Sequence, residues 1–265
     1  MEDYYVKTII NEPRMFVSIK QQTYKICHTA VSLMPSLIRY VKDQKDELCI
    51  TAVTKNPMTL KFIKFKSRYI CYRAVEVCGR AIQFVPAGYR TQHMCIAAVK
   101  SYPPSIALMT KAEQTTKVCK AAIDKDISAL YYINDPSFNI CCYAIRKNDM
   151  ALLFIKNHTE KLYRYAIKQN TYTFTFMKNP SWFVCKQAVN ASPYLLHYIE
   201  NQTSDICEIA IKKDPFSIKY VKNQSEELCV LACELNGLAL EFVKNKTILT
   251  CLAAIHQNPK ASIFI

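Results

Sequence analysis

The thirteen cysteines are the residues of this chain with the widest chemistry, because a thiolate can act as a nucleophile, a disulfide partner or a zinc ligand. Ten of them share a repeat of 22 residues, or 24 in two steps, with one place skipped between Cys141 and Cys185: Cys27, Cys49, Cys71, Cys95, Cys119, Cys141, Cys185, Cys207, Cys229 and Cys251. Stacked neighbours would lie roughly 8–10 Å apart, beyond the ~7 Å between Cα atoms that a disulfide tolerates. Such a column also cannot converge on one metal ion. We interpret these cysteines as buried, reduced thiols, with a metal site as the alternative.

Other catalytic signatures are missing from the sequence. It contains no glycine-rich phosphate loop, no Gly-x-Ser-x-Gly and no His-Glu-x-x-His motif. The five histidines are scattered: His28, His93, His158, His197 and His256. We therefore expect no catalysis, no cofactor, no metal and no small-molecule substrate.

Basic residues are in excess, with a net charge of +14, which would suit an anionic partner. One set closes the second helix in seven of the expected units: Lys20, Lys42, Lys64, Lys156, Lys178, Lys222 and Lys244. These lysines could contact successive phosphates. They could equally stabilise the carbonyl end of a helix, which favours a cation by ~0.3–1 kcal/mol, and we favour this second interpretation.

A second basic group lies in the middle of the chain, on the first helix of each expected unit: Lys120, Lys125, Arg146, Lys147, Arg164, Lys168 and Lys186. It would bind an anionic partner if the units stack in register. The alternative is an ordinary solvated face.

Large apolar residues replace mixed polar ones at the outward positions of the second helix from the sixth unit to the tenth: Tyr131, Met150, Leu153, Tyr172, Tyr194 and Phe216. An exposed apolar stripe marks a partner surface, where Tyr and Met bind well. The alternative is burial against the next unit.

The elements that position these residues form a repeat. Eleven alanines, each three residues after an anchor, share the period of the cysteines, and Tyr163 takes the one anchor place that lacks a cysteine. Ser or Thr stands four residues before almost every anchor, as a helix N-cap. Asn, Asp or Ser, often followed by Pro, marks a second helix start seven residues after it. This pattern predicts an all-α solenoid of about twelve stacked two-helix repeats, with helices of roughly ten and eight residues.

The repeat runs from end to end, so we expect one α-solenoid domain over residues 1–265, with longer and irregular units around 71–118. No run of about 18 apolar residues occurs, and the start MEDYYVKTII lacks the layout of a signal peptide. We expect an intracellular protein, in a host cytoplasm or a virion, that is neither secreted nor membrane-bound.

The unit from Ala232 to Asn245, with Asn236-Gly237 followed by Ala239-Leu240 and an aromatic, resembles an uncharacterised helical-repeat family of mimivirus-like giant DNA viruses. Residues 96–109 and 141–155 form similar units. The resemblance implies a viral origin and an all-helical repeat fold, and it brings no catalytic residue or ligand. The expected function is a non-catalytic scaffold for protein–protein interaction or self-assembly. The alternative is a basic repeat protein that binds nucleic acid.

Overall fold

The computed structural model describes all 265 residues, and every regular element in it is a helix. Twelve α-helices of ten residues each alternate with short 3₁₀-helices. The α-helices are α1 (Glu2–Asn11), α2 (Tyr24–Leu33), α3 (Asp46–Lys55), α4 (Arg68–Val77), α5 (Gln92–Ser101), α6 (Thr116–Lys125), α7 (Phe138–Lys147), α8 (Glu160–Gln169), α9 (Trp182–Ala191), α10 (Ser204–Lys213), α11 (Glu226–Leu235) and α12 (Ile248–Gln257).

The 3₁₀-helices follow the α-helices one by one, with a single extra member, η5. They are η1 (Pro13–Ser18), η2 (Pro35–Tyr40), η3 (Pro57–Phe62), η4 (Gly79–Phe84), η5 (Ala87–Tyr89), η6 (Pro103–Leu108), η7 (Ile127–Tyr132), η8 (Asp149–Phe154), η9 (Thr171–Phe176), η10 (Pro193–Tyr198), η11 (Pro215–Tyr220), η12 (Gly237–Phe242) and η13 (Pro259–Phe264). The all-α repeat architecture predicted from the sequence is confirmed.

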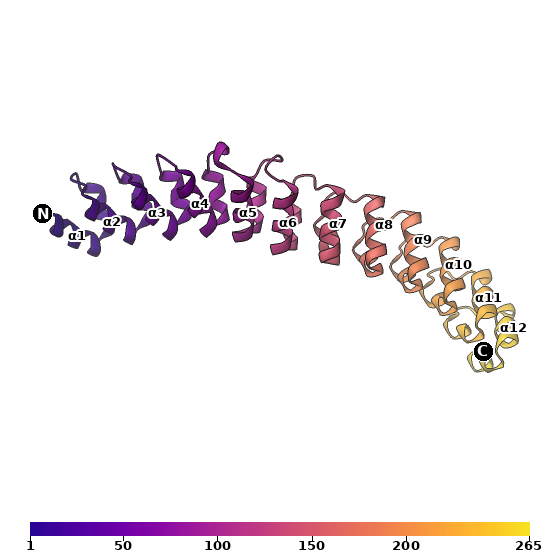
Figure 1. Cartoon of the computed structure of the whole chain (residues 1–265). Coiled ribbons are helices and arrows are strands. Elements are labelled where there is room, and N and C mark those ends of the chain that lie inside the picture. Colours follow the sequence, from indigo (N-terminus) through magenta and orange to yellow (C-terminus); the bar gives the residue numbers. More distant parts are fainter. The chain divides into compact units, whose positions relative to one another are not determined.

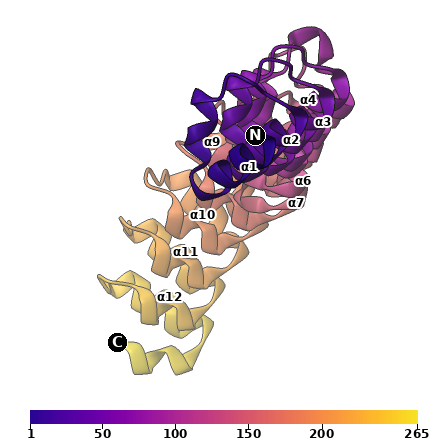
Figure 2. The same ribbon diagram turned by 90° about the vertical axis from the view of Figure 1, so that its left-hand side faces the viewer.

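The chain divides into two compact units, residues 1–140 and residues 141–265, with the division inside α7. Each unit is an α-solenoid. In the first, α1 to α6 follow one another side by side (Figure 1). In the second, Figure 2 shows α10, α11 and α12 stacked in sequence. The single domain over 1–265 stays a prediction.

The α-helices begin where the repeated cap residues predict. The Thr23 hydroxyl accepts a hydrogen bond from the Ile26 N–H, and the Ser67 hydroxyl accepts one from the Ile70 N–H at 3.2 Å. Such bonds satisfy amides of the first turn that have no partner within the helix. The helix ends ten residues on, where the next residue adopts an extended conformation.

The second helix of each repeat is shorter than predicted. It is a six-residue 3₁₀-helix, where the sequence suggested about eight residues. A single residue is both the C-cap of the α-helix and the N-cap of the 3₁₀-helix, and the second helix ends six residues later. The N–H of Asn56 still bonds to the Ala52 carbonyl, while its side chain accepts from the Met58 N–H at 3.1 Å. Six residues then complete the 3₁₀-helix before the extended Ile63.

The core lies between the α-helices and the 3₁₀-helices, and the small-residue column runs through it. All eleven anchor-register alanines are fully buried: Ala30, Ala52, Ala74, Ala98, Ala122, Ala144, Ala166, Ala188, Ala210, Ala232 and Ala254. Larger apolar side chains of the 3₁₀-helices, such as Ile38 and Leu60, pack against this column and are also inaccessible. The predicted packed seam of alanines is confirmed.

The two longer repeats carry their additional residues in the links. In one, Ala87–Tyr89 form the extra helix η5. In the other, a turn is closed by a bond from the Glu113 N–H to the Thr110 carbonyl at 3.0 Å. Both α-helices that follow keep ten residues. No helix of the protein has the length and apolar character needed to cross a lipid bilayer.

Candidate functional site

The apolar stripe predicted from the sequence lies mostly in solvent. In the second unit Met150 and Leu153 on η8, Tyr172 on η9 and Tyr194 on η10 are between 43% and 66% exposed. Tyr131, on η7 of the first unit, is 52% exposed. The alternative of burial against the next repeat is therefore wrong for these five residues.

Phe216 on η11 differs from the other stripe residues. It is half-buried and contacts Phe242 edge to face, with ring centroids 6.0 Å apart. A neighbouring repeat thus covers part of this ring, and the exposed stripe of the second unit ends before it.

An aromatic cluster extends the stripe at Tyr194, and only Tyr194 among its tyrosines was predicted to belong to the stripe. Its ring lies 5.8 Å from Tyr198 and 5.3 Å from Tyr220, and His197 stands beside all three. The hydroxyls of Tyr194 and Tyr198 are 3.4 Å apart, and this hydrogen bond raises the pKa of Tyr198. Tyr198 and Tyr220 are the last residues of η10 and η11, a place where most repeats have an aromatic residue, so the sequence did not set them apart.

The middle basic group is exposed throughout. Its members stand on α6 (Lys120, Lys125), α7 (Arg146, Lys147), α8 (Arg164, Lys168) and α9 (Lys186). The Nε atom of Arg164 lies 3.5 Å from the Oε1 atom of Glu160, and the Arg164 guanidinium lies 5.9 Å from the ring centre of Phe183. The Lys186 ammonium lies 4.9 Å from the ring centre of Trp182.

The repeated lysines that close the second helix bond to protein carbonyls. The Lys42 ammonium donates to the Lys20 carbonyl at 3.2 Å, and that of Lys64 donates to the Lys42 carbonyl at 3.3 Å. Lys222 and Lys244 repeat the arrangement in the second unit. The carbonyl in each case belongs to the preceding repeat, 22 residues earlier. These four lysines thus have a structural role, but the carbonyls that they contact belong to the preceding repeat and not to the end of their own helix.

The cysteines are free thiols, and eleven of the thirteen are buried. Burial raises the pKa of the buried thiols, to about 11 for Cys49, Cys95, Cys119, Cys141 and Cys233. A raised pKa keeps a thiol protonated and poorly nucleophilic at neutral pH. No three metal-ligating side chains of the protein come together.

The sequence did not lead us to predict a series of side-chain hydrogen bonds between the repeats, which we call the glutamine ladder. Five residues before the anchor, a glutamine side chain joins consecutive 3₁₀-helices. The Gln224 amide donates to the carbonyls of Ile218 (2.9 Å) and Phe242 (3.1 Å), and its oxygen accepts from the Lys244 N–H at 2.8 Å. Equivalent bonds are made by Gln22, Gln44, Gln114 and Gln202. The recurrence of glutamine at one place in the repeat was the available signal.

Charged residues stand at three ladder positions that lack glutamine, and one of them, Arg90, makes a ladder bond. Arg90 donates to the Leu108 carbonyl at 3.3 Å, and Glu113 accepts from the Thr110 N–H at 2.7 Å. Lys66 donates to the Ile63 carbonyl at 2.8 Å. In that repeat the backbone needs no acceptor, because residue 86 is a proline and has no N–H.

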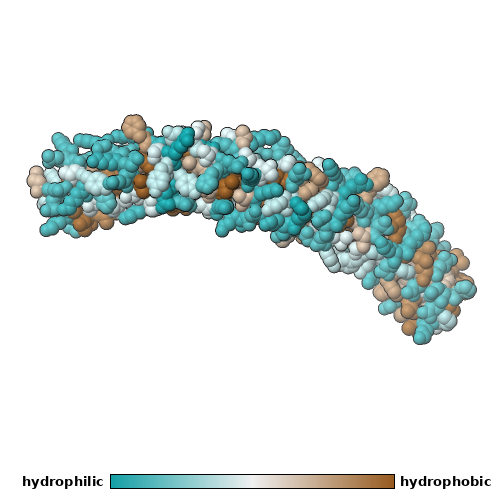
Figure 3. Space-filling view, viewed as in Figure 1, coloured by the Kyte–Doolittle hydropathy of each residue, from teal (hydrophilic) through white to brown (hydrophobic).

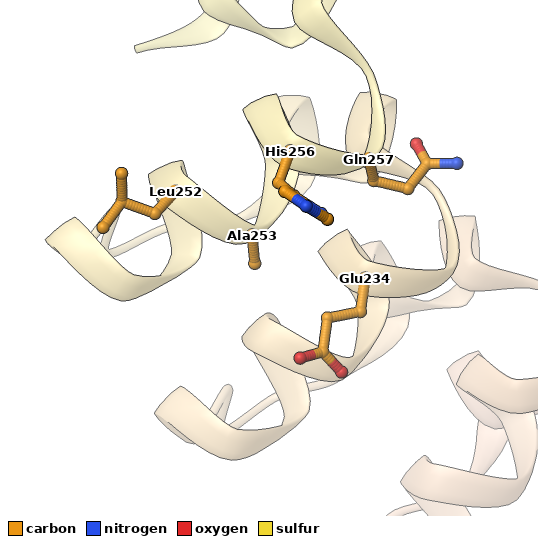
Figure 4. A pocket seen from close by; sticks show the side chains of 5 residues that line it. All are labelled: Glu234, Leu252, Ala253, His256 and Gln257. Atoms are coloured by element: carbon orange, nitrogen blue, oxygen red, sulfur yellow. The ribbon is translucent and has the colours of Figure 1, made fainter.

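The last repeat presents an apolar surface and an open hollow. Ile248, Leu249 and Leu252 on α12 are between 58% and 80% exposed, and brown, hydrophobic atoms are visible at this end of the second unit in Figure 3. Glu234 of α11 and His256 of α12 line a hollow of about 560 Å³ between the two helices (Figure 4). No cysteine or serine side chain lines it, so the pair has no nucleophile to activate there.

Comparison with family models, with curated proteins and with solved structures gives no match to this chain.

Proposed function

We propose that the protein is a non-catalytic helical-repeat scaffold that binds another protein or a further copy of itself through the exposed stripe of the second unit. The observation that supports this proposal most is the exposure of Tyr172 and Tyr194, at 66% and 43%, on consecutive 3₁₀-helices. Tyrosine supplies a large contact area with little loss of conformational entropy on binding, and it is enriched at protein interfaces.

The aromatic cluster around Tyr194 supports the same surface. Four rings from η10 and η11 contact one another, so Tyr194 is held by its neighbours before any partner arrives. Preorganised rings lose less freedom on binding than isolated ones.

The double variant Y172S/Y194S tests the proposal. Tyr172 is mostly exposed, whereas Tyr194 also contacts Tyr198 and Tyr220, so we expect a small fall in melting temperature at most. We also expect a loss of self-association in sedimentation velocity, or of partner capture by the immobilised protein. The variant Y69S is the matched control, because Tyr69 is 59% exposed on α4 of the first unit. Equal association of the wild type and the double variant would rule out the stripe.

Nucleic-acid binding is the second candidate, and one observation favours it. Trp182 and Phe183 on the first turn of α9 are 36% and 58% exposed, and each has a cation beside its ring. Exposed rings between basic side chains are suited to stacking bases while the cations meet phosphates. Titration with single-stranded DNA at two salt concentrations tests it: affinity that falls steeply with salt supports this function. Absence of binding at low salt rules it out.

The intracellular or virion location and the giant-virus origin suggested by the resemblance remain parts of this proposal. An interaction scaffold of this kind needs neither cofactor nor membrane.

A further inference from the structure

One position of the glutamine ladder, at Pro180, has no side chain that can make the ladder's hydrogen bonds. Among the ladder positions that lie within a single unit, glutamine fills five, Arg90 replaces it at one, and lysine stands at two, Lys66 and Lys246. At His158 the ladder is completed by a different residue, because the Tyr163 hydroxyl bonds to the backbone of Lys178. Pro180 has no amide, and no neighbouring side chain takes its place.

The backbone groups that a glutamine at position 180 would meet are the Glu200 N–H and the Tyr198 carbonyl, and no protein group bonds to either. In the next repeat the equivalent groups are the Lys222 N–H and the Tyr220 carbonyl, which bond to Gln202 at 2.8 Å and 2.9 Å. The intervening residues adopt the same conformation, with φ −83° and ψ 119° at Ile199 and φ −73° and ψ 122° at Val221. The Glu200 N–H and the Tyr198 carbonyl therefore have the arrangement that binds a side-chain amide in the next repeat.

A cavity occupies the place where that side chain would lie. It has a volume of about 600 Å³, and Pro180, Tyr198 and Glu200 line it. The cavity at the corresponding place beside Gln22 is only about 200 Å³. At Pro180 no glutamine side chain fills this space.

The chemistry of the lining favours a neutral ligand. Lys178 and Glu200 contribute one positive and one negative charge, and Asn179 and Asn201 are neutral polar residues. Met177, Ile199 and Cys185 contribute apolar surface. The backbone supplies one donor, on Glu200, and one acceptor, on Tyr198. A carboxylate could accept but not donate, and an ammonium could donate but not accept.

We propose that this cavity binds a primary carboxamide on a short aliphatic stem, which completes the ladder as a glutamine side chain does in the neighbouring repeats. The carboxamide oxygen accepts from the Glu200 N–H, and its NH₂ group donates to the Tyr198 carbonyl. The group can belong to a glutamine of a bound polypeptide or to a small free amide. The site is separate from the exposed stripe, so the proposed scaffold function does not depend on it.

The test is an NMR titration that follows the backbone amide of Glu200, with the amide of Lys244 as an internal reference. We expect a saturable shift at Glu200 with acetyl-Gly-Gln-Gly-N-methylamide or with propionamide, in the millimolar range of about 1–100 mM. The peptide with glutamate in place of glutamine should bind about tenfold more weakly or not at all. Tighter binding of the glutamine peptide than of propionamide identifies a polypeptide as the ligand, and comparable binding identifies a free amide.

Two variants complete the design. P180Q supplies the amide from the chain itself, so it should abolish the titration and slow hydrogen exchange at Glu200. P180A removes the proline without adding an amide, so it should bind the probes like the wild type. No saturable shift with either amide probe, or an equal response to the glutamate peptide, would overturn the proposal. Neither result would bear on the stripe, which is tested with the Y172S/Y194S variant.

Discussion

The hydroxyl of Tyr163 donates a hydrogen bond to the carbonyl of Lys178 at 3.1 Å and accepts one from the N–H of the same residue at 3.0 Å. Tyr163 stands at the anchor that is a cysteine in the other repeats from α2 onward, and His158 stands where five repeats have glutamine. Tyr163, at the anchor, thus bonds to the backbone where a glutamine five residues before the anchor bonds in other repeats. The tyrosine compensates for the absence of glutamine at position 158.

Removing the Tyr163 hydroxyl should therefore destabilise the second unit. Y163F leaves two partly buried backbone groups of Lys178 without a partner, and we expect a loss of about 1–3 kcal/mol in urea unfolding. Y69F, on an exposed ring, should change the stability by no more than about 0.5 kcal/mol.

The same position allows a rescue. Y163C should be destabilised, and Y163C/H158Q should regain stability, because it restores the cysteine and glutamine found in neighbouring repeats. A double variant no more stable than Y163C would argue against the compensation.

Gln224 should contribute more to stability than its exposure suggests. Q224M keeps the length of the side chain and deletes three hydrogen bonds, so the Phe242 carbonyl and the Lys244 N–H lose their partner, while the Ile218 carbonyl keeps its bond from the Val221 N–H. We expect a loss of about 1–3 kcal/mol and faster hydrogen exchange at Lys244. Q169M is the control, since Gln169 is exposed and makes no side-chain hydrogen bond. Equal stability of both variants would show that the ladder adds nothing.

Arg90 and Glu113 should behave as a coupled pair. Their charged groups are 3.6 Å apart, and each side chain is only 15% exposed. E113A leaves the guanidinium without its carboxylate and the Thr110 N–H without an acceptor, so we expect a loss of about 2 kcal/mol.

A second change should repair part of this loss. R90Q/E113A should be more stable than E113A, because a neutral glutamine can both donate and accept as it does elsewhere in the ladder. Denaturant unfolding of the two single variants and the double variant measures the coupling. Strict additivity of the three free-energy changes would contradict it.

Glycine is required at position 79 and not at position 88. A Cβ atom on Gly79 would lie 2.0 Å from the backbone oxygen of Ala98, whereas one on Gly88 would meet nothing within 4 Å. G79A must push η4 away from α5, and we expect a loss of at least about 2 kcal/mol. G88A should be neutral or slightly stabilising, because alanine restricts the unfolded chain. Thermal melting of G79A and G88A measures the difference in stability between them. Equal melting temperatures would show that η4 can shift freely.

The buried thiols should make the fold sensitive to alkaline pH. Burial raises the pKa of Cys95 and Cys119 from 9.0 to about 11. Between these values the unfolded chain loses the thiol protons and the folded chain keeps them, so the stability present below pH 9 falls as the pH rises toward 11. Near pH 10 the slope should be about 1 kcal/mol per pH unit for each thiol.

The variant C95A/C119A isolates this effect. It should unfold with a flatter dependence on pH from 9 to 11 than the wild type, and with the same dependence below pH 8. Identical slopes over the alkaline range would show that these thiols ionise freely in the folded protein.

Much of the repeat could be predicted because its signals are local. Thr23 and Ser67 cap the helices whose first turns contain their hydrogen-bond donors, and Asn56 marks the start of η3 two residues before its partner Met58. The alanine column was readable for a related reason: a position that is always small, at one place in a period, must face a close neighbour.

The candidate surfaces were only half predictable. The sequence placed Tyr172 and Phe216 in one stripe, yet the first is 66% exposed and the second is half-buried against Phe242. The second helix was also expected to be longer than the six-residue 3₁₀-helix that forms. A 3₁₀-helix turns its side chains by a different angle per residue than an α-helix does, so helical periodicity alone could not assign which of them face solvent.

By itself, the sequence determined the helix starts and the all-α class, since each depends on residues within about one turn of one another. It also determined the period and the buried small-residue column, because the same residue types recur at one place in successive repeats. Only the tertiary structure decided the hydrogen bonds between repeats. Gln224 meets the Phe242 carbonyl 18 residues away, and Lys64 meets the Lys42 carbonyl 22 residues away. Such partners are brought together by the stacking of whole repeats, which no single repeat encodes.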